Sequence, residues 1–323
     1  MLRALSRLAL VSAEEALLGL LRHLDSQRYD FVATTPATHE RVLARDEMEG
    51  ADRLRAFFGW NRAFRPEQLP EPVLTLLRAA RCLAAEGDRV RSGVRVARLG
   101  DRLFLHSAFP TDSPDAVFFG PDTYRFVRFA GQVLAADPRP VSHLVDLGAG
   151  SGAGAIALAG HVPGARLTLV DRNPEALRLA GINARAAGLA VNLVEAGSLS
   201  AVDGEIDLVI ANPPFMADAA GRAYRDGGGR HGADLSLAWA GEAARRLKPG
   251  GRLILYTGAA IVGGEDRMEP ALCALLAGLG CTCSYEVIDV DIFGEELDHP
   301  AYRDVDRIAA VGLVAEKTGA RTS

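Results

Sequence analysis

The stretch His-Leu-Val-Asp-Leu-Gly-Ala-Gly-Ser-Gly-Ala-Gly, residues 143–154, decides the fold of this chain. It opens with a short apolar run typical of a buried strand, passes into a glycine-rich loop, and continues as a helical pattern. Glycines allow the backbone to turn sharply and to lie against a ligand without an intervening Cβ. In an open α/β sheet, such a loop lies at the carboxyl ends of the strands, where ligands bind.

Strand and helix patterns alternate after this loop. Asn173, Pro174 and Glu175 start a helix, because Asn caps it, Pro fits its first position and the acid complements its dipole. Repeated strand–helix units predict an α/β fold with a doubly wound, mostly parallel sheet covered on both faces. The last two strands have no helix between them and should pair as an antiparallel hairpin at one side. The seven predicted strands are 143–147, 166–171, 191–194, 206–211, 252–257, 284–291 and 307–315.

The amino-terminal part has a different pattern, in which helices come first and a β-hairpin follows. This order is typical of a small helical or winged-helix-like domain. The predicted elements are helices that begin at Ser12 and at Thr35, a helix over 73–85, and a hairpin formed by 94–99 and 102–106.

A chain of 323 residues is long enough for two domains. We predict an amino-terminal domain over 1–115 that recognises the substrate, a linker with a helix over 116–140, and an α/β domain over 141–323. The amino-terminus is interrupted by Arg3 and Arg7 and lacks the apolar core of a signal peptide, and no run approaches membrane-spanning length. We therefore expect a cytoplasmic protein with no membrane partner. The sequence predicts no particular oligomeric state.

The charge balance disfavours a nucleic-acid partner. Residues 1–140 contain 20 arginines and 18 acidic residues, whereas 141–323 contain 16 basic and 23 acidic residues. Neither half has the concentrated basic field that binding of DNA or long RNA usually needs. A nucleic-acid partner is thus the less favoured alternative.

The four cysteines do not predict a metal site. Cys281 and Cys283 should share one face of a strand, but no second cluster of Cys or His lies nearby to complete a zinc site. Reduced thiols in a cytosolic protein are the simpler expectation. We predict no metal cofactor.

Two acidic residues favour S-adenosylmethionine (SAM) as the ligand of the glycine loop. Asp146 lies two residues before the first glycine, where it can attract the ammonium of a methionine moiety and would repel a pyrophosphate. Asp171 ends the second strand, where it can accept hydrogen bonds from ribose hydroxyls. The spacing of Gly148, Gly150 and Ala153 also fits a dinucleotide fingerprint. The two acidic residues are therefore what favours SAM over a dinucleotide.

The fourth strand ends in Asn212-Pro213-Pro214-Phe215, which we predict to be catalytic. The prolines remove two backbone donors, leaving carbonyls as free acceptors. The Asn212 side-chain oxygen and the Pro213 carbonyl can hold both hydrogens of a planar –NH₂ group, and Phe215 can offer a stacking face. The nitrogen lone pair would then point at the methyl group with no strong general base required. The alternative is a turn that ends the strand and places Phe215 in the core.

These motifs resemble the class I SAM-dependent methyltransferases of the glutamine-N5 type, which modify release factors. The resemblance lies in 146–158, 170–184 and 212–215, and extends to 119–123 and 304–307. It implies a Rossmann-like methyltransferase fold, SAM as cofactor with S-adenosylhomocysteine as product, and an acceptor amide held by Asn212 and Pro213. The residues expected to bind SAM are Asp146, Gly148, Ala149, Gly150, Gly152, Asp171, Arg172, Ser198 and Asn212.

The sequence departs from this family at several positions. Phe215 stands where the family usually has Tyr, Ser198 where it has Asp at the adenine contact, and Gly120 where it has Arg. A long glycine-rich loop at 217–232 is either a lid over the substrate or a surface loop. The lid contacts would be Tyr224, Arg225 and His231.

We therefore expect a SAM-dependent N-methyltransferase that acts on a planar nitrogen, either a protein glutamine amide or an amide-bearing small molecule. One alternative keeps this chemistry but uses guanine N2 or adenine N6 of ribosomal or transfer RNA. Another is a protein that binds SAM without methyl transfer or uses it for other chemistry; the intact Asn-Pro-Pro-Phe motif argues against it.

Overall fold

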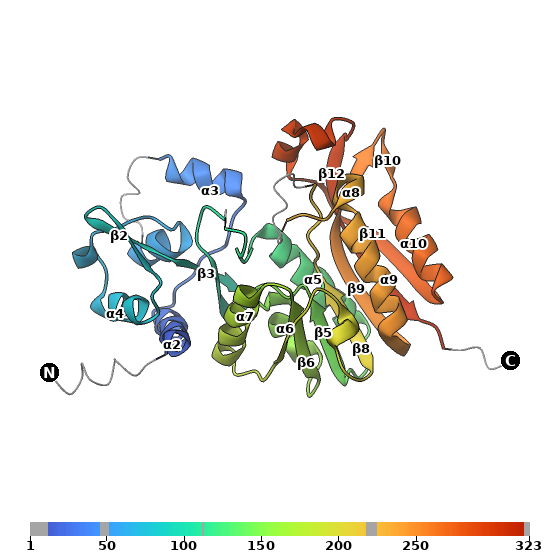
Figure 1. Ribbon diagram of the computed structural model, residues 1–323, viewed down its shortest axis with the longest axis horizontal. Coiled ribbons are helices and arrows are strands. Elements are labelled where there is room, and N and C mark those ends of the chain that lie inside the picture. Colours follow the sequence, from blue (N-terminus) through green and yellow to red (C-terminus); the bar gives the residue numbers. More distant parts are fainter. Residues whose placement is uncertain (1–11, 46–51, 112, 218–224, 320–323) are drawn as a thin grey trace.

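The computed structural model describes residues 12–45, 52–111, 113–217 and 225–319 (Figure 1). The amino-terminal part consists of short helices and two hairpins, and the carboxyl-terminal part is built on one large twisted sheet.

The large sheet has the strand order β11-β12-β9-β8-β5-β6-β7. Strands β5 to β9 pair in parallel, whereas β12 is antiparallel to both β9 and β11. The predicted doubly wound, mostly parallel sheet with an antiparallel hairpin at one side is confirmed. The short strand β10 (Glu265–Asp266) pairs with β9 and was not predicted. The strands are β5 (His143–Leu147), β6 (Arg166–Asp171), β7 (Asn192–Glu195), β8 (Ile206–Ala211), β9 (Leu247–Val262), β11 (Cys281–Ile292) and β12 (Arg307–Lys317).

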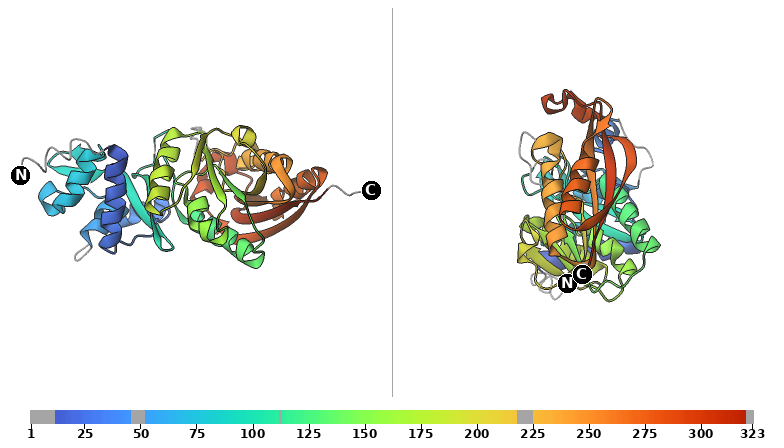
Figure 2. Two further views of the ribbon diagram at one scale, coloured as in Figure 1. Left: turned by 90° about the horizontal axis from the view of Figure 1, so that it is seen from below. Right: turned by 90° about the vertical axis from the view of Figure 1, so that its right-hand side faces the viewer.

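Helices cover both faces of this sheet (Figure 2). Alternate residues of β8 pack into opposite layers: Leu208 and Ile210 meet α5 and α6, and Val209 and Ala211 meet α9 and α10. No helix within the described ranges is long and apolar enough to cross a membrane. The helices of this part are α5 (Pro121–Ala136), α6 (Ala153–Leu158), η3 (Ala159–His161), α7 (Pro174–Ala186), η4 (Leu199–Ala201), α8 (Gly229–Gly232), α9 (Asp234–Arg246), α10 (Met268–Gly278), η5 (Gly294–Asp298) and η6 (Pro300–Tyr302).

The amino-terminal part begins its first two helices where the capping residues predict. Ser12 Oγ accepts a hydrogen bond from the Glu15 amide at 3.2 Å, and Thr35 Oγ1 accepts one from the Thr38 amide at 3.2 Å. The predicted hairpin is present as β3 and β4. The elements are α2 (Ala13–Ser26), α3 (Pro36–Leu43), η1 (Arg55–Gly59), η2 (Pro66–Gln68), α4 (Glu71–Ala79), β1 (Leu83–Glu86), β2 (Arg89–Ser92), β3 (Val94–Leu99) and β4 (Arg102–Ser107).

The helix predicted over 73–85 is wrong beyond residue 79. Arg81 adopts a positive φ of 56°, and the Cys82 amide bonds to the Leu77 carbonyl at 3.0 Å, which ends α4. The chain then forms β1, which pairs with β2 across a turn at Gly87. The alanines of β1 have little strand propensity, so the apolar pattern led the predicted helix to be continued through them.

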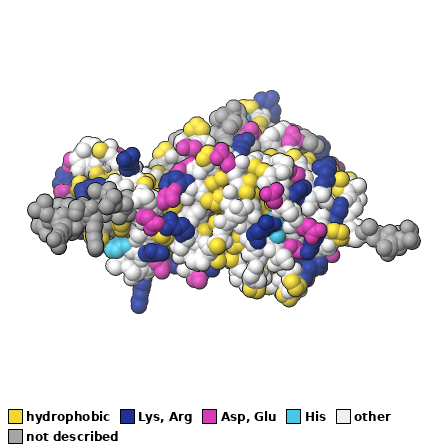
Figure 3. Space-filling view, turned by 60° about the horizontal axis from the view of Figure 1, so that its bottom comes forward, with side chains coloured by type: hydrophobic (Ala, Val, Ile, Leu, Met, Phe, Trp, Pro, Cys, Tyr) yellow, Lys and Arg dark blue, Asp and Glu magenta, His cyan; other side chains and the backbone are white. Residues whose placement is uncertain are grey.

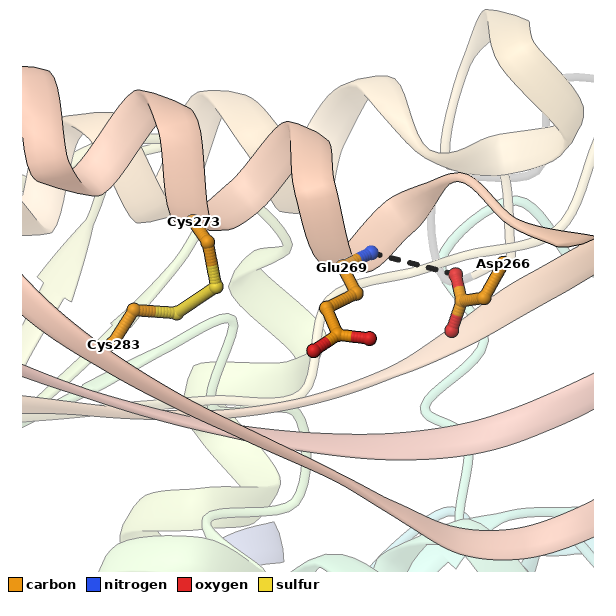
Figure 4. The surroundings of a disulfide bond; sticks show 4 residues. All are labelled: Asp266, Glu269, Cys273 and Cys283. Atoms are coloured by element: carbon orange, nitrogen blue, oxygen red, sulfur yellow. Dashed lines mark hydrogen bonds between the residues drawn. A yellow bond between two sulfur atoms is a disulfide. The ribbon is translucent and has the colours of Figure 1, made fainter.

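The expectation that all cysteines are reduced is also wrong. Cys273 of α10 and Cys283 of β11 form a disulfide (Figure 4). Helix α10 runs back along the strand that follows it, which places the two Cα atoms 5.7 Å apart. This pairing depends on how the helix packs against the strand. The spacing of the cysteines along the sequence does not indicate it. Cys82 and Cys281 are free.

One buried side chain joins the amino-terminal hairpin to the large sheet's helices. The Asn183 amide of α7 accepts a hydrogen bond from the Leu105 amide (2.9 Å) and donates to the Leu105 carbonyl (3.1 Å) and the Ser151 carbonyl (2.9 Å). Asn183 is 1% exposed, and apolar residues of α2, β3 and β4 form one core with residues of α6 and α7 around it. The predicted domain division at 115 and 140 stays a prediction.

Replacing Asn183 with Ala should lower the free energy of unfolding by about 2–4 kcal/mol, because two carbonyls and one amide lose their buried partner. Urea denaturation followed by circular dichroism measures the change. Asn192→Ala, at an exposed position of β7, is the matched control and should have little effect. Equal stability of the two variants would contradict the joining role of Asn183.

Candidate active site

A cavity of about 190 Å³ lies at the carboxyl ends of β5, β6 and β8. The glycine loop forms its floor, and residues from α5, α9 and the segment before α5 complete its wall. It unites three of the predicted regions: the loop after β5, the acid that ends β6, and the motif after β8. The residues that line it are Ala116, Val117, Phe118, Thr123, Phe126, Asp146, Leu147, Gly148, Ala149, Gly150, Ser151, Ala153, Gly154, Asp171, Arg172, Asn173, Ala176, Ala196, Gly197, Asn212, Pro214, Leu235 and Trp239.

The glycine loop is shaped by close contacts that a Cβ would prevent. Gly148 has a φ of 73°, and a Cβ there would lie 2.4 Å from the Trp239 ring. A Cβ on Gly154 would lie 2.7 Å from Asp146 Oδ2. These glycines allow Trp239 and Asp146 to pack directly against the loop backbone.

Asp146 is a buried carboxylate at the base of this loop. It is 2% exposed, and its Oδ2 accepts a hydrogen bond from the Ala155 amide at 2.8 Å. Burial raises its pKa to about 7, and the nearby Asp171 carboxylate adds to the rise. No cation of the described residues pairs with it. Asp146 is thus suited to a positively charged ligand group.

Asp171 holds two turns of the site together. Its Oδ2 accepts from the Gly150 amide (2.8 Å) and its Oδ1 from the Asn173 amide (2.9 Å). Burial raises its pKa, although these hydrogen bonds act in the opposite direction. Each oxygen retains a second lone pair that can accept from a ligand hydroxyl.

The Asn-Pro-Pro-Phe motif divides between the cavity and the core. Asn212 and Pro214 line the cavity, and the half-buried Asn212 side chain has no hydrogen-bond partner in the described part of the chain. Pro213 is buried outside the cavity lining. The Phe215 ring, 8% exposed, packs between Tyr256 and Phe293, with ring centroids 6.3 and 6.0 Å away.

Phe215 is therefore not placed to stack on an acceptor in this cavity. Gly258 of β9 provides the reason, since a Cβ there would lie 2.4 Å from the Phe215 ring. The missing side chain opens a slot in the sheet that receives the ring. This is the core position that the alternative interpretation of the motif anticipated.

Two further predicted cofactor residues lie outside the cavity lining. Gly152 has a φ of 77° and faces the core, where a Cβ would lie 2.9 Å from Ile156 and 3.0 Å from Leu169. It permits α6 to pack closely on β6. Ser198 caps η4 by accepting from the Ser200 amide at 3.3 Å, and its neighbour Gly197 lines the cavity instead.

The structure adds wall residues that local patterns did not single out. Trp239 and Leu235 come from the first turns of α9, and Thr123 and Phe126 come from α5. Trp239, Leu235 and Phe126 are aromatic or aliphatic residues of amphipathic helices, and such residues are indistinguishable in sequence from ordinary core residues. Only the packing of α5 and α9 against the loop brings them to the cavity.

Two of the predicted lid contacts, Arg225 and His231, do not line the cavity. Arg225 pairs with Glu296, and His231 Nε2 lies 3.0 Å from Asp304 Oδ1. Both side chains thus attach the end of the 217–232 loop to the segment that precedes β12. Tyr224, the third predicted contact, lies outside the described residues.

The raised pKa of Asp146 predicts a pH-dependent stability. Its ordinary value of 3.8 applies to the unfolded chain and about 7 to the folded protein, so its contribution to stability falls as pH rises between these values. Asp146→Asn removes this loss. In ligand-free protein, the stability of the variant relative to the wild type should increase by about 2–3 kcal/mol between pH 5 and pH 8. Urea denaturation at both pH values measures it, with exposed Asp101→Asn as control; a pH-independent difference would contradict the assignment.

Comparison with known proteins shows which family the chain is similar to. The family described as Methyltransferase small domain matches residues 130–271. A release factor glutamine methyltransferase of Deinococcus radiodurans is 37% identical over 172 residues, which cover 50% of this chain and 58% of that protein. Its counterpart in Cereibacter sphaeroides is 33% identical over 208 residues, which cover 60% of this chain and 70% of that protein.

Among solved structures, a methyltransferase from Pyrococcus furiosus is 18% identical with a TM-score of 0.44, covering 63% of this chain and 89% of that chain. The chain spans 58% of the length of the Deinococcus relative and 70% of the Cereibacter relative. The chain contains a methyltransferase domain and covers 70% of a relative to which it is 33% identical. It therefore belongs to the release factor glutamine methyltransferase family.

Proposed function

We propose that this chain transfers a methyl group from SAM to the side-chain nitrogen of a protein glutamine, as in a release factor. The observation that carries the proposal is the single cavity that contains both the acids of the glycine-loop region and Asn212. The names of the relatives, release factor glutamine methyltransferase, support the acceptor.

The cofactor would be held by groups on the glycine-loop side of the cavity. Asp146 would take the ammonium of the methionine moiety, and its otherwise unpaired buried carboxylate supports this role. The free lone pairs of Asp171 would accept from the ribose hydroxyls. Gly148, Ala149, Gly150 and Arg172 also line this side of the cavity. When bound, SAM supplies an electrophilic methyl on a sulfonium.

The acceptor amide would be held by the motif after β8. The Asn212 side-chain oxygen and the Pro213 carbonyl would accept its two hydrogens, which fixes the plane of the nitrogen. Both acceptors bind more strongly as positive charge grows on the nitrogen, so they favour the transition state over the ground state. Alignment supplies much of the acceleration, and no side chain needs to act as a strong base.

We also propose that the amino-terminal part selects the acceptor. The segment Ala116 to Phe118, which connects the hairpin to α5, lines the same cavity as Asn212. RNA is a poorer acceptor on charge grounds: on the face drawn in Figure 3, Lys and Arg side chains are interspersed with Asp and Glu. Such a surface lacks the continuous basic field that phosphate backbones require.

Asn212→Ala should lower kcat for methyl transfer to a purified bacterial release factor by about 10²–10³-fold, because a transition-state contact is lost. The Kd of SAM should stay within about twofold, because Asp146 and Asp171 would provide the main contacts to the cofactor. Transfer from methyl-labelled SAM and calorimetric titration of SAM measure the two quantities.

Asn192→Ala is the matched control and should retain full turnover. Undiminished kcat in Asn212→Ala would overturn the role of Asn212. Incorporation of label into RNA, with none in protein, when the wild type is incubated with fractionated extract would overturn the protein acceptor.

A further inference from the structure

A second, smaller cavity lies in the amino-terminal part, directly beside the first. It encloses about 20 Å³, and the polar residues of its wall are Thr34, His39, Arg95, His106, Ser107 and Thr111. Val117 and Phe118 line both cavities, so the two cavities are neighbours.

Arg95 gives this cavity its charge. The side chain is 5% exposed; its Nε donates to the Gly59 carbonyl at 3.0 Å, and its Nη2 lies 3.4 Å from His39 Nδ1. No carboxylate of the described residues pairs with it. Burial lowers its pKa to about 10, so it remains protonated near neutral pH. A buried cation without a counter-ion is unfavourable unless a ligand supplies the negative charge.

Two neighbouring polar atoms lack partners. His106 Nε2 and Thr34 Oγ1 are buried with no hydrogen-bond partner among the described residues. Burial, followed by the Arg95 charge, lowers the pKa of His106 and brings that of His39 to about 4, so both rings are neutral. No acidic residue in the part of the chain that the structure describes lines the cavity. The site therefore combines a single positive charge with unsatisfied polar atoms.

We propose that this cavity binds a carboxylate group of the methyl acceptor while the acceptor's amide lies at Asn212. The proposal rests on the methyl transfer proposed above. A flat carboxylate matches the planar guanidinium of Arg95. A cavity of about 20 Å³ exceeds the roughly 10–15 Å³ that one water needs, yet it admits only an end group. This small volume favours a carboxylate over a tetrahedral phosphate.

The carboxylate could come from two sources with the same chemistry. One is an Asp or Glu side chain close to the methylated glutamine of a protein; the other is the carboxylate of a free small molecule that carries an amide. A glutamine peptide with an adjacent Glu represents the first source, and N-acetylglutamine represents the second.

Binding is tested without methyl transfer by titrating the full chain, labelled with ¹⁵N-histidine, with sodium acetate. The ring resonances of His39 and His106 should shift saturably, and sodium chloride or phosphate at equal ionic strength should not reproduce the shift. Arg95→Gln should abolish it, whereas the matched control Arg65→Gln, at an exposed position, should retain it. An unsaturable shift, preference for phosphate, or a shift retained in Arg95→Gln would overturn the carboxylate site.

Methyl transfer tests the role of the site. Arg95→Gln should raise KM for the Glu-containing peptide at least about tenfold, the loss expected for one charge-assisted hydrogen bond, and leave kcat unchanged. A matched peptide with Gln in place of that Glu should show no change. Greater methylation of N-acetylglutamine than of the peptide would assign the site to a small molecule. Equal losses with both peptides would make Arg95 structural and overturn the proposal.

Thr34→Val tests the site independently if Arg95→Gln does not fold. It removes an unpaired buried hydroxyl, so it should preserve or raise the melting temperature while weakening acetate binding several-fold. Unchanged acetate binding would count against the site. If no acceptor is methylated by the wild type, the proposed function fails, and the acetate titration alone decides whether the cavity binds a carboxylate.

Discussion

The buried Asn183 amide is the interaction on which the arrangement of both cavities depends. It hydrogen-bonds both backbone groups of Leu105 in the amino-terminal hairpin and also reaches the glycine loop at Ser151. A polar side chain in an apolar core has few favourable positions, so this amide fixes the hairpin more specifically than the surrounding leucines can. The hairpin's β3 contains Arg95, and the segment after β4 contains Val117 and Phe118. Asn183 therefore helps to fix their position relative to the cofactor loop.

The strands of the large sheet could be predicted because their signal is local. The bounds of β5, β6 and β8 agree with the predicted ranges, since each is a buried apolar run between clear turn residues. The end of α4 could not be predicted, because it depends on the positive φ of Arg81. The Cys273–Cys283 disulfide likewise depends on how α10 packs against β11.

The candidate site was predictable where its residues follow strand ends. Asp146, Asp171 and Asn212 belong to parallel strands or follow them directly, so the sheet topology brings them together. Phe215 was expected in the site but lies in the core, because the slot that receives it is made by Gly258 on a different strand. Trp239 was missed for the converse reason: its contact with Gly148 exists only once α9 has packed.

Phe118 contributes to the walls of both cavities, and a Cβ on Gly120 would lie 2.6 Å from its ring, so the ring has little room on that side. A ring confined in this way cannot adjust to a ligand in one cavity without changing the space in the other. A ligand that moved this ring in one cavity would thus alter the affinity of the other cavity for its ligand, and the effect would be reciprocal and equal in free energy.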